Sequence, residues 1–108
     1  MLDQWIVPVQ VLAELLAVVA RKRPDLATDA IDLVAAITKT AECPSTDTED
    51  IASAFILATR HRLQYFDALI IAVAARAGAT TLYSEDMPDG LTIGPLTIRN
   101  PFKSETAA

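Results

Sequence analysis

The chain has 108 residues, of which 52% are hydrophobic and 21% are charged, and its formal net charge is −5. One domain with a real hydrophobic core is the expected organisation for this length, and the scarcity of glycine favours helix over strand. The acidic balance excludes binding of nucleic acid through a broadly basic surface, and it argues against binding to a membrane surface. A bound cation that reversed the local field would still allow action on nucleic acid.

The sequence also limits the cellular compartment. No apolar run reaches the roughly 18 residues that a membrane-spanning helix needs, and no signal peptide is visible at the N-terminus. Cys43 is the only cysteine, which excludes an internal disulfide. The sequence therefore predicts a cytoplasmic protein without a membrane contact.

The chain is expected to begin with a short strand and a long helix. Residues 5–7 are bulky or β-branched and predict a buried strand. The helix over residues 9–23 is apolar on nearly all sides, which predicts burial on most sides. Its polar stripe is narrow and consists of Gln10, Glu14 and Arg21.

Three further helices follow. Thr28 is expected to cap the second helix, whose apolar residues have helical spacing. Thr46 and Glu49 form a capping box that predicts the start of the third. Asp67 begins the fourth helix, which is almost free of polar side chains and ends at Gly78.

The C-terminal part is expected to supply the remaining strands. Residues 80–83 and 96–99 predict two strands, and residues 88–90 predict a turn between them. Because helices separate the predicted strands, we expect an α/β fold with a parallel sheet and helices on its faces. One domain over residues 1–102 is expected, followed by a disordered tail over residues 103–108.

Three acidic residues are candidates for a functional site, and each has an ordinary alternative. Glu14 is either part of a solvated stripe or a charge on a mostly buried helix that needs a partner or a metal. Asp67 is either a helix N-cap or a metal ligand, and these roles are compatible. Asp86 is either a turn residue or a ligand beyond the end of a strand, where Ser84 would support it. Glu85 is either a second supporting group or a surface charge.

A divalent cation would explain three acids at one place. Converging carboxylates repel one another and raise their own pKa values. Mg²⁺ and Mn²⁺ relieve this repulsion because hard cations prefer oxygen ligands. Such an ion activates water and stabilises charge on a phosphoryl group.

One basic cluster is the remaining candidate. His61 is the only histidine, so a metal centre built from several histidines is excluded. Arg60, His61 and Arg62 follow one another at a predicted helix C-terminus, where positive charge is favourable. They are either surface charges or contacts to phosphate groups.

Four segments in this order resemble the PIN-domain family, and more closely the VapC-type toxins of toxin–antitoxin pairs. They are PVQVLAE at residues 8–14, YFDALI at 65–70, LYSEDM at 82–87 and NPF at 100–102. The resemblance implies a three-layer α/β/α sandwich around a parallel sheet, and a ribonuclease that depends on Mg²⁺ or Mn²⁺. It implies an RNA substrate and an antitoxin-like protein partner.

The resemblance also assigns the acids. The family's site usually has four, and by motif Glu14 matches the second, Asp67 the third and Asp86 the fourth. The first acid belongs to an Asp-Thr-Asn motif on a central strand, and no such segment occurs in this sequence. A shifted start site, a truncated paralogue and a segment supplied by a partner each explain its absence.

These observations leave three functional hypotheses open. The first is a ribonuclease whose site contains Glu14, Asp67 and Asp86. The second is a non-catalytic PIN-like module, incomplete at its N-terminus, that dimerises or binds an antitoxin-like helix through a large apolar surface. Strand edges exposed by the missing segment would also allow pairing with another chain, as in a strand-exchanged homodimer. The third is a small helical bundle without a site, in which the three acids lie far apart.

Overall fold

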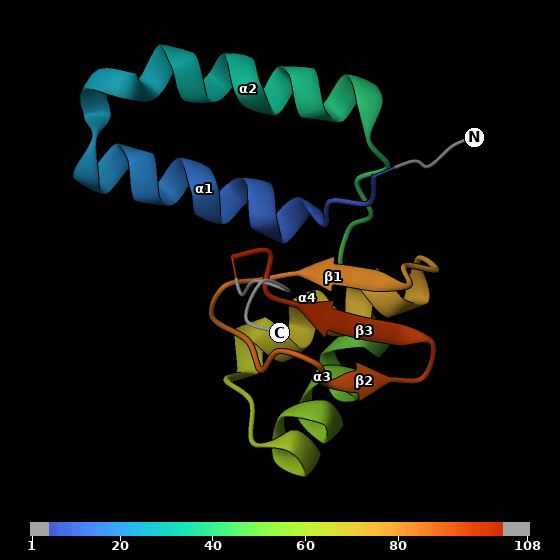
Figure 1. The fold of residues 1–108 in the computed structure, drawn as a ribbon. Coiled ribbons are helices and arrows are strands. Elements are labelled where there is room, and N and C mark those ends of the chain that lie inside the picture. The colour runs from blue at the N-terminus through green and yellow to red at the C-terminus, as the bar shows by residue number, and fades with distance from the viewer. Residues whose placement is uncertain (1–4, 103–108) are drawn as a thin grey trace.

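A computed structural model describes residues 5–102 of the chain, and these residues form helices followed by a small sheet (Figure 1). The helix-rich α/β character expected from the sequence is confirmed. The predicted tail over residues 103–108 lies outside the described residues. The elements are α1 (Val9–Lys22), the 3₁₀ helix η1 (Pro24–Leu26), α2 (Ala27–Thr40), α3 (Thr48–His61), α4 (Tyr65–Arg76), β1 (Thr81–Tyr83), β2 (Thr92–Ile93) and β3 (Leu96–Arg99).

The sheet is mixed, with the strand order β1-β3-β2. Strands β1 and β3 pair in parallel, as expected, and Leu82 lies opposite Ile98. The sequence did not predict β2, which is two residues long and pairs antiparallel with β3. The strand expected over residues 5–7 is reduced to a single parallel bridge between Ile6 and Glu42.

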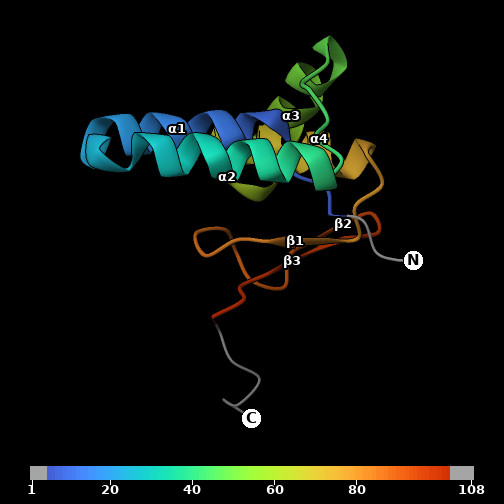
Figure 2. The same ribbon diagram turned by 90° about the horizontal axis from the view of Figure 1, so that it is seen from above.

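The main core lies between α4 and the sheet. Every residue from Ala68 to Ala74 is buried, which agrees with the apolar sequence of α4. On β3 the side chains alternate, so that Leu96 and Ile98 are fully buried and Arg99 is exposed. Figure 2 shows the four α-helices on one side of the sheet. The second helical layer of the expected sandwich is not seen among residues 5–102.

Helices α1 and α2 form a hairpin beside this core (Figure 1). The prediction that α1 is buried on most sides is wrong, because α2 covers only part of its surface. Only Leu12 of α1 is buried, and only Ala30 of α2. Val18 and Leu33 are among the exposed large apolar residues of the hairpin. Its apolar sequence is therefore not explained by the contacts within residues 5–102.

Helix α1 begins at Val9 as predicted, whereas the starts of α2, α3 and α4 differ from the predicted ones by one to three residues. Leu26 is the N-cap of α2, and the prediction of Thr28 is wrong. Asp47, with extended backbone angles, is the N-cap of α3, and its N–H donates to Asp50 at 2.8 Å. The capping box is thus Asp47 with Asp50, and the prediction of Thr46 with Glu49 is wrong. At the end of α4, Gly78 adopts a φ of 93°, which glycine adopts without strain, and the predicted stop is confirmed.

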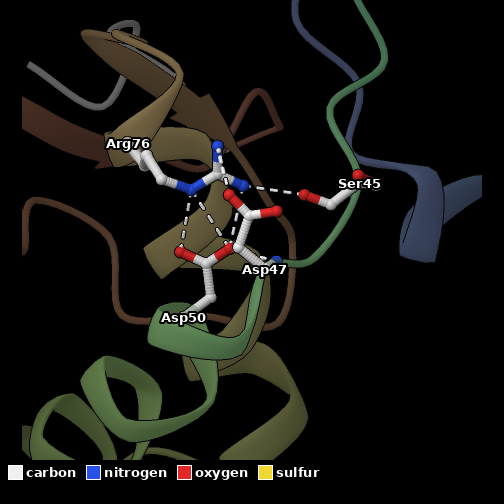
Figure 3. Close-up of polar contacts among 4 residues, drawn as sticks. All are labelled: Ser45, Asp47, Asp50 and Arg76. Atoms are coloured by element: carbon white, nitrogen blue, oxygen red, sulfur yellow. Dashed lines mark hydrogen bonds and ion pairs between the residues drawn. The ribbon is translucent and has the colours of Figure 1, made fainter.

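The register of α3 is explained by an ion pair that involves Asp50 (Figure 3). Asp50 is only 3% exposed, and it accepts hydrogen bonds from Nε and Nη2 of Arg76 at 2.8–3.1 Å. Asp47 lies 3.4 Å from the same guanidinium group. These hydrogen bonds from Arg76 lower the pKa of Asp50 below its usual value.

The same arginine fixes the connection between the hairpin and the core. Its Nη2 donates to the Ser45 carbonyl at 2.7 Å. The preceding carbonyls of Glu42 and Pro44 accept from Val7 and Val9 at 2.8 and 2.9 Å. Arg76 at the end of α4 is thereby connected to the start of α1, the helix that carries Glu14.

Candidate acidic site

Glu14 projects from the middle of α1 and is exposed. Its Oε2 accepts a hydrogen bond from Gln10 Nε2 at 2.8 Å. The same nitrogen donates to the Phe66 carbonyl at 3.2 Å, in the first turn of α4. Glu14 is therefore attached to the helix that carries the second candidate acid.

Asp67 lies in the first turn of α4 and is half-buried. Its role as N-cap is excluded, because Gln64 caps α4 by accepting the Asp67 N–H at 3.0 Å. Burial raises the pKa of the Asp67 carboxyl, and the negative charges of Glu14 and Asp86 raise it further. The helix dipole alone would favour a negative charge at this position. A carboxyl whose pKa is raised in spite of the dipole is typical of a functional site.

Asp86 lies in the loop after β1 and is exposed. The Ser84 hydroxyl accepts from the N–H groups of Asp86 and Met87 at 3.3 and 3.2 Å, which shapes the loop. The backbone N–H of Ser84 donates to the Arg99 carbonyl at 3.0 Å and thereby attaches the loop to β3. Asp86 thus lies beyond the carboxyl end of a parallel strand, where ligands bind in α/β sheets.

Two polar residues outside the predicted set hold the same loop from the other side. The Asn100 N–H donates to Asp89 Oδ1 at 2.8 Å, and the Asn100 amide donates to the Glu85 carbonyl at 3.4 Å. The side chain of Glu85 is exposed. In the sequence, only the motif around Asn100-Pro101 indicated this region, because hydrogen bonds between residues 11 and 15 positions apart leave no periodic pattern.

The three predicted acids share one electrostatic neighbourhood, since Glu14 and Asp86 both act on Asp67. Their donors are all carboxylate oxygens, with the Ser84 hydroxyl nearby on the loop, and this set suits a hard divalent cation. No three His, Cys, Asp or Glu side chains within residues 5–102 lie close enough together to enclose a metal ion. The donor chemistry therefore matches the ion, and the ligands would have to approach one another around it.

An open hollow of about 510 Å³ adjoins Glu14. Its walls are mostly apolar and come from α1, α4 and the connection before α3. They are formed by Val9, Gln10, Glu14, Thr46, Phe66 and Leu69. A second hollow of about 520 Å³ lies over α3 and α4 near Arg76 and contains none of the three acids.

The basic cluster lies at the other end of the short connection to α4. Arg60 and His61 belong to the last turn of α3, and Arg62 ends the helix in the left-handed conformation with a φ of 56°. Arg60 and Arg62 are exposed. None of the three makes an ion pair with another residue in the range 5–102. Their contact with RNA remains a prediction.

Replacing Glu14 with glutamine is expected to lower the pKa of Asp67, because the charge of Glu14 raises that pKa. Only part of the elevation is lost, since burial and Asp86 still act on the carboxyl group. An NMR titration of the Asp67 carboxyl carbon measures the change, with Glu49→Gln on α3 as the control. Equal titration midpoints in the two variants would show that Glu14 and Asp67 do not interact.

Comparison with known proteins gives one family. A sequence model described as PIN domain matches residues 1–87, a range that contains Glu14, Asp67 and Asp86. The segment around Asn100 lies beyond the matched range. No curated protein matches the chain. Among the helices of residues 5–102, none is long and apolar enough to cross a membrane.

Proposed function

Because the chain belongs to the PIN-domain family, we propose that it is a metal-dependent ribonuclease of the VapC type, the toxin of a cytoplasmic toxin–antitoxin pair. PIN domains are generally nucleases, and they typically depend on divalent metal ions. The observation that supports a retained site here is the raised pKa of Asp67, which burial causes first and the charges of Glu14 and Asp86 increase further. A structural role for Asp67 would not require two further acids beside it.

In this proposal Glu14, Asp67 and Asp86 hold one Mg²⁺ or Mn²⁺ ion. When bound, the ion supplies a Lewis acid that polarises the scissile phosphodiester and lowers the pKa of the attacking water. Ser84 holds the backbone of the Asp86 loop through its two accepted hydrogen bonds, and Glu85 is the neighbouring charge. The repulsion that raises the pKa of Asp67 is relieved when these carboxylates hold a cation.

The substrate of the proposed enzyme is RNA. The protein carries a net charge of −5, so it has no broadly basic surface for the phosphates of RNA. The phosphates must instead bind at a local cluster of positive side chains. In the proposal Arg60, His61 and Arg62 provide this positive charge beside the start of α4.

We further propose that β1 receives an additional strand, which supplies the first acid of the family. The Thr80 carbonyl and the Ser84 N–H both bond to β3, so the backbone groups of Thr81 and Tyr83 face away from it. Within residues 5–102 nothing else pairs with this edge, and the Trp5 ring lies beside it, 6.2 Å from the Tyr83 ring. A strand from a partner, as in a strand-exchanged homodimer, would extend the sheet at this edge.

A non-catalytic interaction module is the second candidate. The observation that favours it is the exposure of the apolar side chains of Val18, Ile31 and Leu33 on the hairpin. Exposed groups of large apolar side chains are typical of surfaces that bind another protein. In this alternative the hairpin and the open edge of β1 bind an antitoxin-like protein or a second copy. The acids then have no chemical role, and their replacement leaves the function unchanged.

Cleavage of a mixed RNA pool with increasing Mn²⁺ tests the proposed function. The parent chain is expected to cleave RNA in a Mn²⁺-dependent manner that a chelator abolishes. Asp67→Asn, which preserves size and shape, is the inactive control. A parent chain no more active than Asp67→Asn would overturn the ribonuclease proposal for this chain and leave the interaction module.

A further inference from the structure

The side chain of Gln10 connects two of the candidate acids. Its Nε2 donates to Glu14 Oε2 at 2.8 Å and to the Phe66 carbonyl at 3.2 Å. Phe66 directly precedes Asp67 in the first turn of α4. One amide group thus links the Glu14 carboxylate on α1 to the backbone that carries Asp67.

The orientation of this amide follows from its partners. A carboxylate and a carbonyl both accept hydrogen bonds, so the atom between them must be the NH₂ group. The Oε1 atom is consequently turned into a buried position where no hydrogen-bond donor reaches it. A buried acceptor without a donor is unfavourable, and a glutamine on a helix surface avoids this by turning its amide toward water. The two bonds of Nε2 therefore determine the conformation.

We propose that Gln10 is a positioning residue, which holds the carboxylate of Glu14 toward Asp67 so that both can bind the same cation. This inference rests on the proposed function for the identity of the cation. The hydrogen bond to Glu14 alone would be a weak contact between side chains four residues apart on one helix. The hydrogen bond to the Phe66 carbonyl fixes the Gln10 amide relative to α4. The hydrogen bond from this amide to Glu14 therefore holds the carboxylate in a fixed orientation relative to α4.

Gln64 provides a matched comparison at the same end of α4. Its Oε1 accepts the Asp67 N–H at 3.0 Å and caps the helix, and within residues 5–102 it makes no hydrogen bond to Glu14. Both glutamines form a hydrogen bond with the first turn of α4, but only Gln10 also forms one with Glu14. A variant of Gln64 therefore disturbs the helix start without releasing Glu14.

The test uses Gln10→Met, which keeps the length of the side chain and removes both hydrogen bonds. In the metal-free protein, NMR couplings are expected to report one fixed χ1 rotamer of Glu14 in the parent chain and rotamer averaging in Gln10→Met. In calorimetric titrations without RNA, the affinity for Mn²⁺ is expected to fall about tenfold, as is usual when a residue that orients a ligand is lost. The melting temperature should stay equal or rise, because the unpaired acceptor is also removed.

The controls separate this inference from the function on which it rests. Gln64→Met is expected to lower the melting temperature and to leave the Glu14 rotamer fixed. An unchanged Glu14 rotamer in Gln10→Met overturns the positioning role, and so does an unchanged Mn²⁺ affinity when Asp67→Asn has lost binding. A parent chain that binds Mn²⁺ no better than Asp67→Asn overturns the proposed function instead, while the rotamer measurement still decides whether Gln10 orients Glu14.

Discussion

Replacing Asp50 with alanine is expected to lower the free energy of unfolding by about 3 kcal/mol, the lower end for breaking a buried ion pair, because Arg76 stays partly solvated. The carboxylate is almost fully buried and accepts several hydrogen bonds from Arg76, whose side chain is 31% exposed. Its loss also removes the bond from the Asp47 N–H at the start of α3. Urea denaturation followed by circular dichroism measures the change.

The pH dependence of this effect has a defined sign. Because Arg76 lowers the pKa of Asp50 in the folded protein, the stabilisation is complete above the pKa of the unfolded chain. It is lost as the pH falls toward the lowered value of the folded state, so the parent chain and Asp50→Ala should converge in acid. Asp25→Ala is the control, since the Arg23–Asp25 pair has similar geometry but is more than 60% exposed. An equal loss of stability in Asp50→Ala and Asp25→Ala would refute the expectation that the buried ion pair contributes more than the exposed one.

Single replacements of the three acids, Glu14→Gln, Asp67→Asn and Asp86→Asn, are each expected to lower kcat/KM for RNA about 100-fold or more. The double variants should lose little beyond the single ones, because ligands of one ion act as a unit. Steady-state cleavage of a fluorescent RNA measures both results. Additive losses would indicate that the acids do not share an ion.

The stability of these variants provides an internal check. The pKa of Asp67 is raised in the folded protein, so its charged form opposes folding above that pKa. Asp67→Asn should therefore be as stable as the parent chain at neutral pH, or more stable by up to about 1 kcal/mol, the scale for partly exposed charges. Asp32→Asn, at an exposed acid beyond the first turn of α2, should change neither activity nor stability. If Asp67→Asn were inactive because it is unfolded, its loss of activity would say nothing about a role of Asp67 in catalysis.

The elements that the sequence predicted best are those with strong local signals. The uninterrupted apolar run of α4, its stop at Gly78 and the alternation along β3 depend on neighbouring residues only. Burial of α1 was predicted wrongly, because an apolar helix does not reveal how much of its surface a partner covers. The start of α3 was misplaced by one residue, since Arg76 selects Asp50 from a distance of 26 residues along the chain.

For the candidate site, motif order named Glu14, Asp67 and Asp86, and their role as ligands of one metal ion stays a prediction. In the structure, burial and the charges of Glu14 and Asp86 raise the pKa of Asp67. The N-cap alternative for Asp67 was excluded only when Gln64 was seen to cap α4. The sequence identified Gln10 only as part of a motif and of the polar stripe of α1, and Asn100 only as part of a motif. Their hydrogen bonds join segments distant in sequence and were therefore not predicted. Spacing shows which residues share a helix face, and it does not show which helices meet.

From the burial of the helices, we expect α2 and the core around α4 to open at different free energies. α2 packs against α1 and η1, and its one buried residue is Ala30, whereas α4 is buried along most of its length. Detaching α2 therefore leaves the core of α4 and β3 covered, so its backbone amides should exchange with solvent through local opening rather than global unfolding. The segment with the lowest local stability is then the one that presents Ile31 and Leu33. A chain that binds there would slow this opening and make the two parts unfold as one cooperative unit.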